Sequence, residues 1–77
     1  RLTITLGMKQ EGLAEVAVFN LRGQKLKTLF SGRKDKGNFS LQWDGTDETG
    51  SKLPSGIYLV RMNSDNGESL RKVVLSK

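Results

Sequence analysis

The sequence contains no cysteine and no histidine among its 77 residues. Without cysteine the chain forms no disulfide framework and offers no thiolate nucleophile, and cysteine usage says nothing about its redox compartment. Without histidine it lacks the commonest general base, the commonest neutral metal ligand and the usual partner of a nucleophilic serine. These two absences argue against an enzyme, and we expect no cofactor.

Long apolar runs and aromatic residues are also scarce. No stretch approaches the roughly 18 apolar residues that would cross a bilayer. One tryptophan, one tyrosine and three phenylalanines are too few to favour a planar row of exposed rings for binding carbohydrate. Hydrophobic residues still make up 35% of the chain, which suffices for the thin core of one small domain. Because the first residue is Arg1 and not Met, we expect residues 1–77 to be a fragment or processed piece of a larger protein.

The charge is moderately basic, at +5 from 13 basic and 8 acidic residues. Arg33, Lys34 and Lys36 form the densest basic stretch, in a segment of residues 31–37 that we expect to be an exposed loop. No aromatic stacking residue is interleaved with them, so no nucleic acid partner is predicted. Peripheral contact with an anionic surface stays open as an alternative.

Apolar residues alternate with polar ones at a period of two, which is typical of strands with one buried face. Phe39, Leu41 and Trp43 give the clearest example. The predicted strands cover residues 2–6, 13–20, 25–30, 39–43, 56–62 and 69–75. Six short strands with turn signals between them, and no helical period, predict an all-β protein. We expect a small immunoglobulin-like antiparallel β-sandwich of about six to seven strands in a single domain.

Several details of this sheet are predicted too. Residues 13–20 carry apolar side chains on both faces, which indicates a central strand, and residues 56–62 do the same. Leu26 and Leu29 are three positions apart, which indicates a bulge or an irregular edge. Asn66-Gly67 is the strongest hairpin signal. Basic residues are expected on edge strands, where they hinder aggregation: Lys25, Lys27, Arg71, Lys72 and Lys77.

The two large amphipathic rings invite a binding role, but a structural role is favoured for both. Trp43 lies on a strongly alternating strand, so we expect it at the centre of the core. Tyr58 follows a turn glycine, a position where a tyrosine usually anchors a loop through one hydrogen bond.

Residues 44–52 are rich in turn-forming residues and contain the acidic residues Asp44, Asp47 and Glu48. Aspartates in such segments usually accept hydrogen bonds from their own backbone in Asx turns. The spacing does not match that of an EF-hand, so a weak calcium site in residues 44–48 is kept only as an alternative.

A series of spaced motifs runs through the chain in a familiar order. They are Val18-Phe-Asn-Leu-Arg-Gly-Gln-Lys-Leu26 with Leu29, Gly37, Trp43-Asp-Gly-Thr-Asp with Gly50, Pro54-Ser-Gly-Ile-Tyr58, and Arg71-Lys-Val-Val-Leu-Ser-Lys77. This series resembles the type A C-terminal sorting domain of the type IX secretion system, within the superfamily of the Ig-like domain of flagellar hook-capping proteins. The motif residues with a structural role would be Gly23, Trp43, Asp44, Gly45, Asp47, Gly50, Gly56 and Tyr58.

The resemblance implies a folded address tag that directs an upstream cargo domain through the outer membrane. Its expected partners are the translocon and the surface-attachment machinery, and its expected location is the cell surface or the medium. The residues expected to be recognised by the translocon lie in the last strand: Arg71, Lys72, Val73, Val74, Leu75 and Lys77. Edge-strand addition is one hypothesis for the docking mode.

Two other functions remain open at this point. One is a structural module, either a hook-cap-like assembly domain or a spacer beside a catalytic domain. The other is an accessory domain that binds carbohydrate or a surface. The hook-capping relatives share the Trp43-Asp-Gly-Thr-Asp and Ser55-Gly-Ile-Tyr motifs, so only the lysine-valine end of the chain favours sorting.

Overall fold

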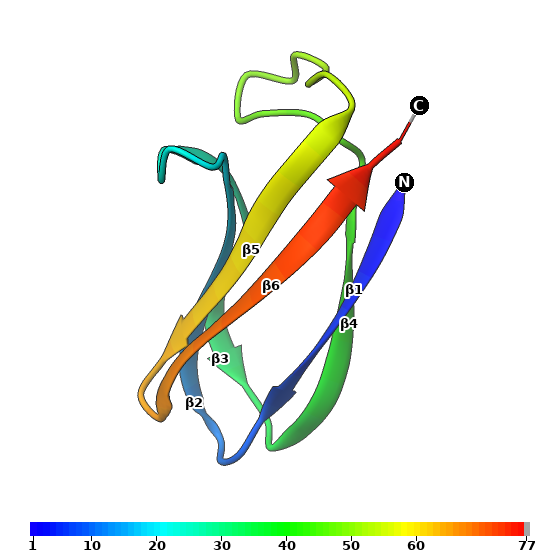
Figure 1. Ribbon diagram of the computed structural model, residues 1–77. Coiled ribbons are helices and arrows are strands. Elements are labelled where there is room, and N and C mark those ends of the chain that lie inside the picture. Colours follow the sequence, from blue (N-terminus) through cyan, green and yellow to red (C-terminus); the bar gives the residue numbers. More distant parts are fainter. Residues whose placement is uncertain (77) are drawn as a thin grey trace.

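Six antiparallel strands form two sheets in the computed structural model, which describes residues 1–76 (Figure 1). The strands are β1 (Leu2–Met8), β2 (Gly12–Phe19), β3 (Lys25–Lys34), β4 (Gly37–Trp43), β5 (Gly56–Ser64) and β6 (Gly67–Leu75). The smaller sheet pairs β1 with β4, and the larger has the order β3-β2-β5-β6. The prediction of a small Ig-like antiparallel β-sandwich is therefore confirmed. The described residues include no helix that could span a membrane.

The core lies between the two sheets and is built from alternate residues of each strand. Every second residue of β1 is buried, and so are the corresponding residues of β2 and β5. The buried cluster contains Ile4, Leu6, Met8, Ala14, Val16, Val18, Trp43, Tyr58, Val60, Met62 and Leu75. The central positions predicted for residues 13–20 and 56–62 are correct, because β2 and β5 are the two inner strands of the larger sheet.

Two irregularities in β3 place leucines against this core. Val16 pairs with Phe30 and Ala17 with Thr28, so Leu29 has no pairing partner in β2 and is an extra residue of β3. A second register shift, between Val18 and Phe19, makes Leu26 an extra residue in the same way. Both leucines are partly buried against the core. The predicted bulge is confirmed, and it explains their three-residue spacing.

The prediction of an exposed loop at residues 31–37 is wrong for most of its length. β3 continues to Lys34 and β4 begins at Gly37, so Asp35 and Lys36 alone connect the two strands. Arg33 forms an ion pair with Glu11 at 3.3 Å, and the ammonium group of Lys34 lies over the rings of Phe30 and Phe39. β3 is an edge strand with much solvent exposure, so charged side chains are tolerated along it. These charges hide the alternation of apolar and polar residues by which a strand is predicted from sequence.

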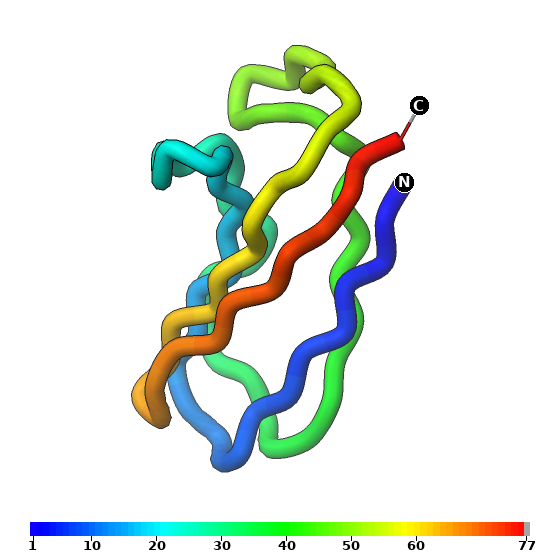
Figure 2. The backbone as a smooth tube through the Cα atoms, viewed as in Figure 1, coloured from blue at the N-terminus to red at the C-terminus, as the bar shows by residue number. Residues whose placement is uncertain are grey.

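The start of β1 and the end of β6 lie at the same end of the sandwich (Figure 2). The last hairpin has Asp65 and Asn66 as its connecting residues, since Ser64 pairs with Gly67. β6 therefore begins two residues before the predicted strand. At the end of the sandwich near the termini, residues 44–55 connect β4 to β5, and we call this segment the cap loop.

Candidate functional site

The aspartates of the cap loop organise its backbone. The Asp44 carboxylate accepts hydrogen bonds from the backbone N–H and the hydroxyl of Thr46, at 3.1 and 2.6 Å. The Asp47 carboxylate accepts from the backbone N–H and hydroxyl of Thr49, at 3.0 and 2.7 Å, and from the backbone N–H of Ser51 at 3.1 Å. The predicted Asx-turn chemistry is confirmed.

These hydrogen bonds also fix the ionisation of both carboxyl groups. The Thr46 hydroxyl, its backbone N–H and the charge of Lys27 lower the pKa of Asp44. The Thr49 hydroxyl is the main cause that lowers the pKa of Asp47. A general acid at neutral pH needs a raised pKa, so both carboxylates are suited to accepting hydrogen bonds and not to donating protons.

The third acidic residue of the loop points elsewhere. Glu48 accepts a hydrogen bond from the backbone N–H of Thr28 at 3.1 Å, and its own backbone N–H donates to the carbonyl of Leu26 at 2.9 Å. The three carboxylates therefore serve three different sets of donors. Within residues 1–76 no group of three or more acidic or other ligand side chains could hold a metal ion, so nothing in the geometry supports the calcium alternative.

Trp43 and Tyr58 fasten the cap loop to the core. Trp43 is fully buried, and its indole N–H donates to the carbonyl of Thr46 at 2.9 Å. The ring of Tyr58 meets it edge-on at a centroid distance of 5.3 Å, and the Tyr58 hydroxyl donates to the carbonyl of Pro54 at 2.6 Å. The predicted core position of Trp43 and the predicted loop anchor at Tyr58 are both confirmed.

Three of the motif glycines, Gly23, Gly45 and Gly50, lie in connecting segments, Gly56 begins β5, and Gly45 also makes a close contact. Gly45 has a φ of 81°, and a Cβ placed there would lie 3.1 Å from the Leu75 Cδ1 atom. A side chain there would be strained by the backbone conformation and crowded against Leu75. The other motif glycines, Gly23, Gly50 and Gly56, all have positive φ angles.

Lys27 links the cap loop to β3, a role that the sequence did not reveal. Its ammonium group donates to the Thr46 hydroxyl at 2.9 Å and lies 3.5 Å from the Asp44 carboxylate. Sequence reasoning had assigned Lys27 only to protection of an edge strand. Its position on the edge strand β3 is confirmed, and no motif in the sequence signals the contact across 17 residues to Asp44.

Comparison with known protein families matches residues 3–68 to the FlgD Ig-like domain. The chain belongs to the FlgD Ig-like domain family. The match confirms the hook-capping part of the resemblance and does not name the sorting domain. Residues 71–77, on which the sorting interpretation depends, lie beyond the matched segment of this FlgD Ig-like domain. A search of curated proteins and a search of solved structures found no match.

The last strand of this FlgD Ig-like domain is an edge of the larger sheet. The side chains of Arg71, Lys72 and Val74 are exposed, whereas Val73 is half-buried and Leu75 is buried beside Gly45. A partner could reach the first three without unfolding the domain, and Leu75 has a role in the core. Lys77 lies outside the described residues. Recognition by a translocon stays a prediction for all six residues.

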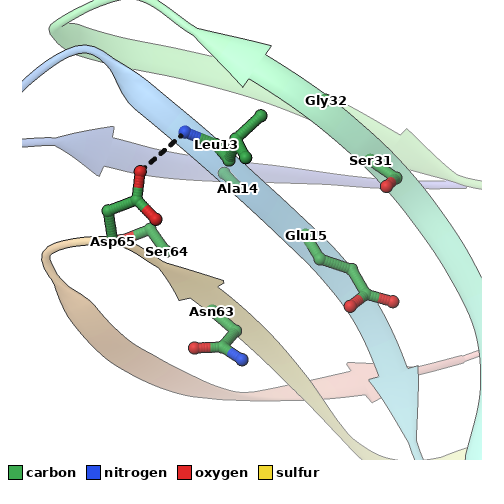
Figure 3. Close-up of a pocket in the computed structure, with 8 residues that line it drawn as sticks. All are labelled: Leu13, Ala14, Glu15, Ser31, Gly32, Asn63, Ser64 and Asp65. Atoms are coloured by element: carbon green, nitrogen blue, oxygen red, sulfur yellow. Dashed lines mark hydrogen bonds between the residues drawn. The ribbon is translucent and has the colours of Figure 1, made fainter.

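One concavity of the domain was not foreseen from sequence. It has a volume of about 330 Å³ and lies on the outside of the larger sheet, across β3, β2 and β5 (Figure 3). Its titratable groups are Glu15, which forms an ion pair with Lys25 at 2.8 Å, and Asp65, which accepts a hydrogen bond from the Leu13 N–H at 3.3 Å. Lys25 lowers the pKa of Glu15. Both carboxylates already have partners, so the concavity has no group poised for catalysis.

Proposed function

We propose that this FlgD Ig-like domain is a non-catalytic accessory module that serves a larger extracellular protein as a structural or assembly unit. The observation that carries the proposal is the family match over residues 3–68, which includes β2 to β5 in full, all of β1 except Leu2, and the whole cap loop. A module of this kind needs a stable fold and an outer surface, and it needs no reactive centre.

The use of the polar side chains supports this proposal. Asp44, Asp47 and Tyr58, which would be the first candidates for chemistry, all bond to neighbouring groups of the cap loop. Every buried polar side-chain atom of the described residues has a hydrogen-bond partner. Polar groups satisfied within the fold stabilise it and are not free to bind or activate a substrate.

The proposal is tested by fusing the domain behind a fluorescent reporter that carries an export signal. The fusion is expressed in a bacterium with a working type IX translocon and in a matched strain without it. An accessory module should leave the reporter in the same place in both strains, in a folded state. Delivery to the surface or medium in the first strain alone would overturn the proposal.

The second candidate is the type IX sorting domain, favoured by the motif resemblance and by the exposed side chains of Arg71, Lys72 and Val74 on an edge strand. In this function the domain would act by recognition without chemistry, and the translocon would add a strand to the open edge of β6. The outer-membrane translocon would be the partner, the upstream domain the cargo, and the cell surface or medium the destination.

Charge reversal on β6 separates the two candidate functions better than deletion of the strand. Deletion would also remove Leu75, which is buried in the core, and would therefore disturb the fold. For a sorting domain, the double variant Arg71→Glu/Lys72→Glu should abolish delivery of the reporter. The control Lys36→Glu/Lys52→Glu changes the charge equally at exposed positions away from β6 and should be delivered normally. Equal delivery of both variants would contradict recognition through β6.

A further inference from the structure

The outer face of the larger sheet carries an unusual share of the exposed apolar surface. Five large hydrophobic side chains are exposed in the described residues, and four of them project from this face: Leu13, Ile57, Leu70 and Val74, with 54, 43, 61 and 58% of their surface accessible. Their orientation follows from the alternation of the strands, because Ala14, Tyr58 and Leu75, the neighbours of Leu13, Ile57 and Val74, face the core. Ile57, Val74 and Leu70 lie on β5 and β6, and Leu13 lies at the hairpin end of β2. Exposed apolar surface of this kind marks interaction surfaces.

The apolar residues of this face are arranged in rows across the strands. Phe19 of β2 is beside Leu59 of β5, which pairs with Lys72 of β6. Ile57 pairs with Val74 in the row nearer the cap loop. The Phe19 ring is covered by the Arg61 guanidinium at 4.5 Å. An arginine stacked on an apolar ring in this way supplies both area and charge at an interface.

The charges on this face lie in rows across the strands. Lys25 and Lys72 lie at the two ends of the Phe19–Leu59 row, on the two edge strands. Glu15 and Glu68 lie in a row nearer the β5–β6 hairpin, and both have basic partners in the same chain, Lys25 at 2.8 Å and Arg61 at 3.5 Å. Arg33 projects beyond the acidic row. This mixed charge does not favour a purely acidic or purely basic partner.

We propose that this outer face binds a second copy of the chain, face to face. A two-fold axis along the strands would place Lys25 opposite the Lys72 of the other copy, which is repulsive. An axis across the strands passes through the row that contains Ala17, Arg61 and Leu70. It places Lys72 opposite the Glu68 of the other copy, and Leu70 and Arg61 each opposite its equivalent, so it gives two attractions and one like-charge contact. The charges thus select the arrangement in which strands of the two copies are antiparallel.

The size of the face sets the strength of this association. Four strands about 4.8 Å apart and about eight residues long at 3.3 Å per residue give roughly 500 Å² per copy. The total of roughly 1,000 Å² is at the lower limit for specific interfaces. The dimer is therefore weak and reversible, and it would hold two copies of the larger protein together, which goes beyond the proposed accessory function.

Sedimentation equilibrium of the 77-residue chain, from about 10 μM to about 1 mM, tests this proposal. The wild type should show a monomer–dimer equilibrium, and Lys72→Glu and Glu68→Lys should each raise the dissociation constant about tenfold or more, since each replaces two attractions by two repulsions. An equimolar mixture of the two variants should recover dimer, and so should the double variant that exchanges both charges. Lys36→Glu is the control and should dimerise normally.

Two results would overturn the proposal. One is a wild-type chain that is monomeric at every concentration. The other is a dimer that neither single variant weakens, because that dimer would use another surface, such as the open edge of β6. Far-UV circular dichroism of each variant verifies the fold, and the exposed positions of Lys72 and Glu68 leave the core untouched.

Discussion

At the scale of single residues, Trp43 connects the cap loop to the core by two kinds of contact. Its ring is fully buried, and its indole N–H bonds the carbonyl of Thr46. We expect Trp43→Ala to destabilise the domain by about 3–5 kcal/mol, a large share of the roughly 4–12 kcal/mol that 77 residues usually provide.

Trp43→Phe is the matched variant, since it keeps a ring and removes the donor, and it should lose about 1–3 kcal/mol. Urea unfolding followed by circular dichroism measures both values. Wild-type stability in Trp43→Ala would contradict the central packing role.

Gly45 and Gly50 provide a second test within the cap loop. Both have positive φ angles, but an added Cβ meets the Leu75 side chain at Gly45 and nothing within 4 Å at Gly50. Gly50→Ala should lose about 1–3 kcal/mol through backbone strain alone. Gly45→Ala should lose clearly more, because steric crowding against Leu75 adds to the strain. Equal losses in thermal or urea unfolding would show that the Gly45–Leu75 contact has no energetic weight.

The aspartates predict how stability depends on pH. The lowered pKa values of Asp44 and Asp47 mean that the folded state favours the ionised groups. The two carboxylates therefore stabilise the folded state at a pH above their ordinary pKa of 3.8. This stabilisation is lost as the pH falls through their lower pKa values in the folded state. The melting temperature should drop between about pH 4 and pH 2. The double variant Asp44→Asn/Asp47→Asn keeps the acceptor oxygens but cannot titrate, so its melting temperature should fall less over this pH range. An identical fall in the variant and the wild type would show that Asp44 and Asp47 do not cause the pH dependence.

At the scale of strands, apolar alternation and turn signals together located all six elements, because most strands bury one face. The pattern missed the end of β3, where Arg33 and Lys34 obscure it although their contacts with Glu11 and Phe39 are compatible with a strand. The bulge at Leu29 was predictable because two leucines three apart cannot both face inward in a regular strand. The tether from Lys27 to the cap loop was not predictable, because it depends on the packing of β3 against residues distant in sequence.

The edge strand β6 carries a charge on its inner face. Arg71 pairs with the buried Val60, so both project from the same side of the sheet, yet Arg71 is exposed. A charge at such a position hinders pairing with another strand. Arg71→Val should therefore increase aggregation, measured as light scattering during prolonged incubation, whereas Lys52→Val in the cap loop should not. Unchanged scattering of Arg71→Val would assign edge protection to other residues.

At the scale of the whole molecule, the sequence alone predicted the β-sandwich fold and the hook-capping part of the family resemblance. The matching motifs are those that build the cap loop and the core, since Trp43, Gly45 and Tyr58 all have structural reasons for their positions. The apolar outer face could not be predicted, because its residues come from different strands, and Ile57 and Val74 meet only through the register of β5 and β6.

This FlgD Ig-like domain should fold as a module with its own core. The decisive experiment is urea unfolding of residues 1–77 alone, followed in one titration by Trp43 fluorescence and far-UV circular dichroism. We expect one cooperative transition with coincident curves and a slope of about 1 kcal/mol per molar urea, because Trp43 lies in a single core shared by both sheets. A gradual loss of structure with curves that do not coincide would contradict this expectation.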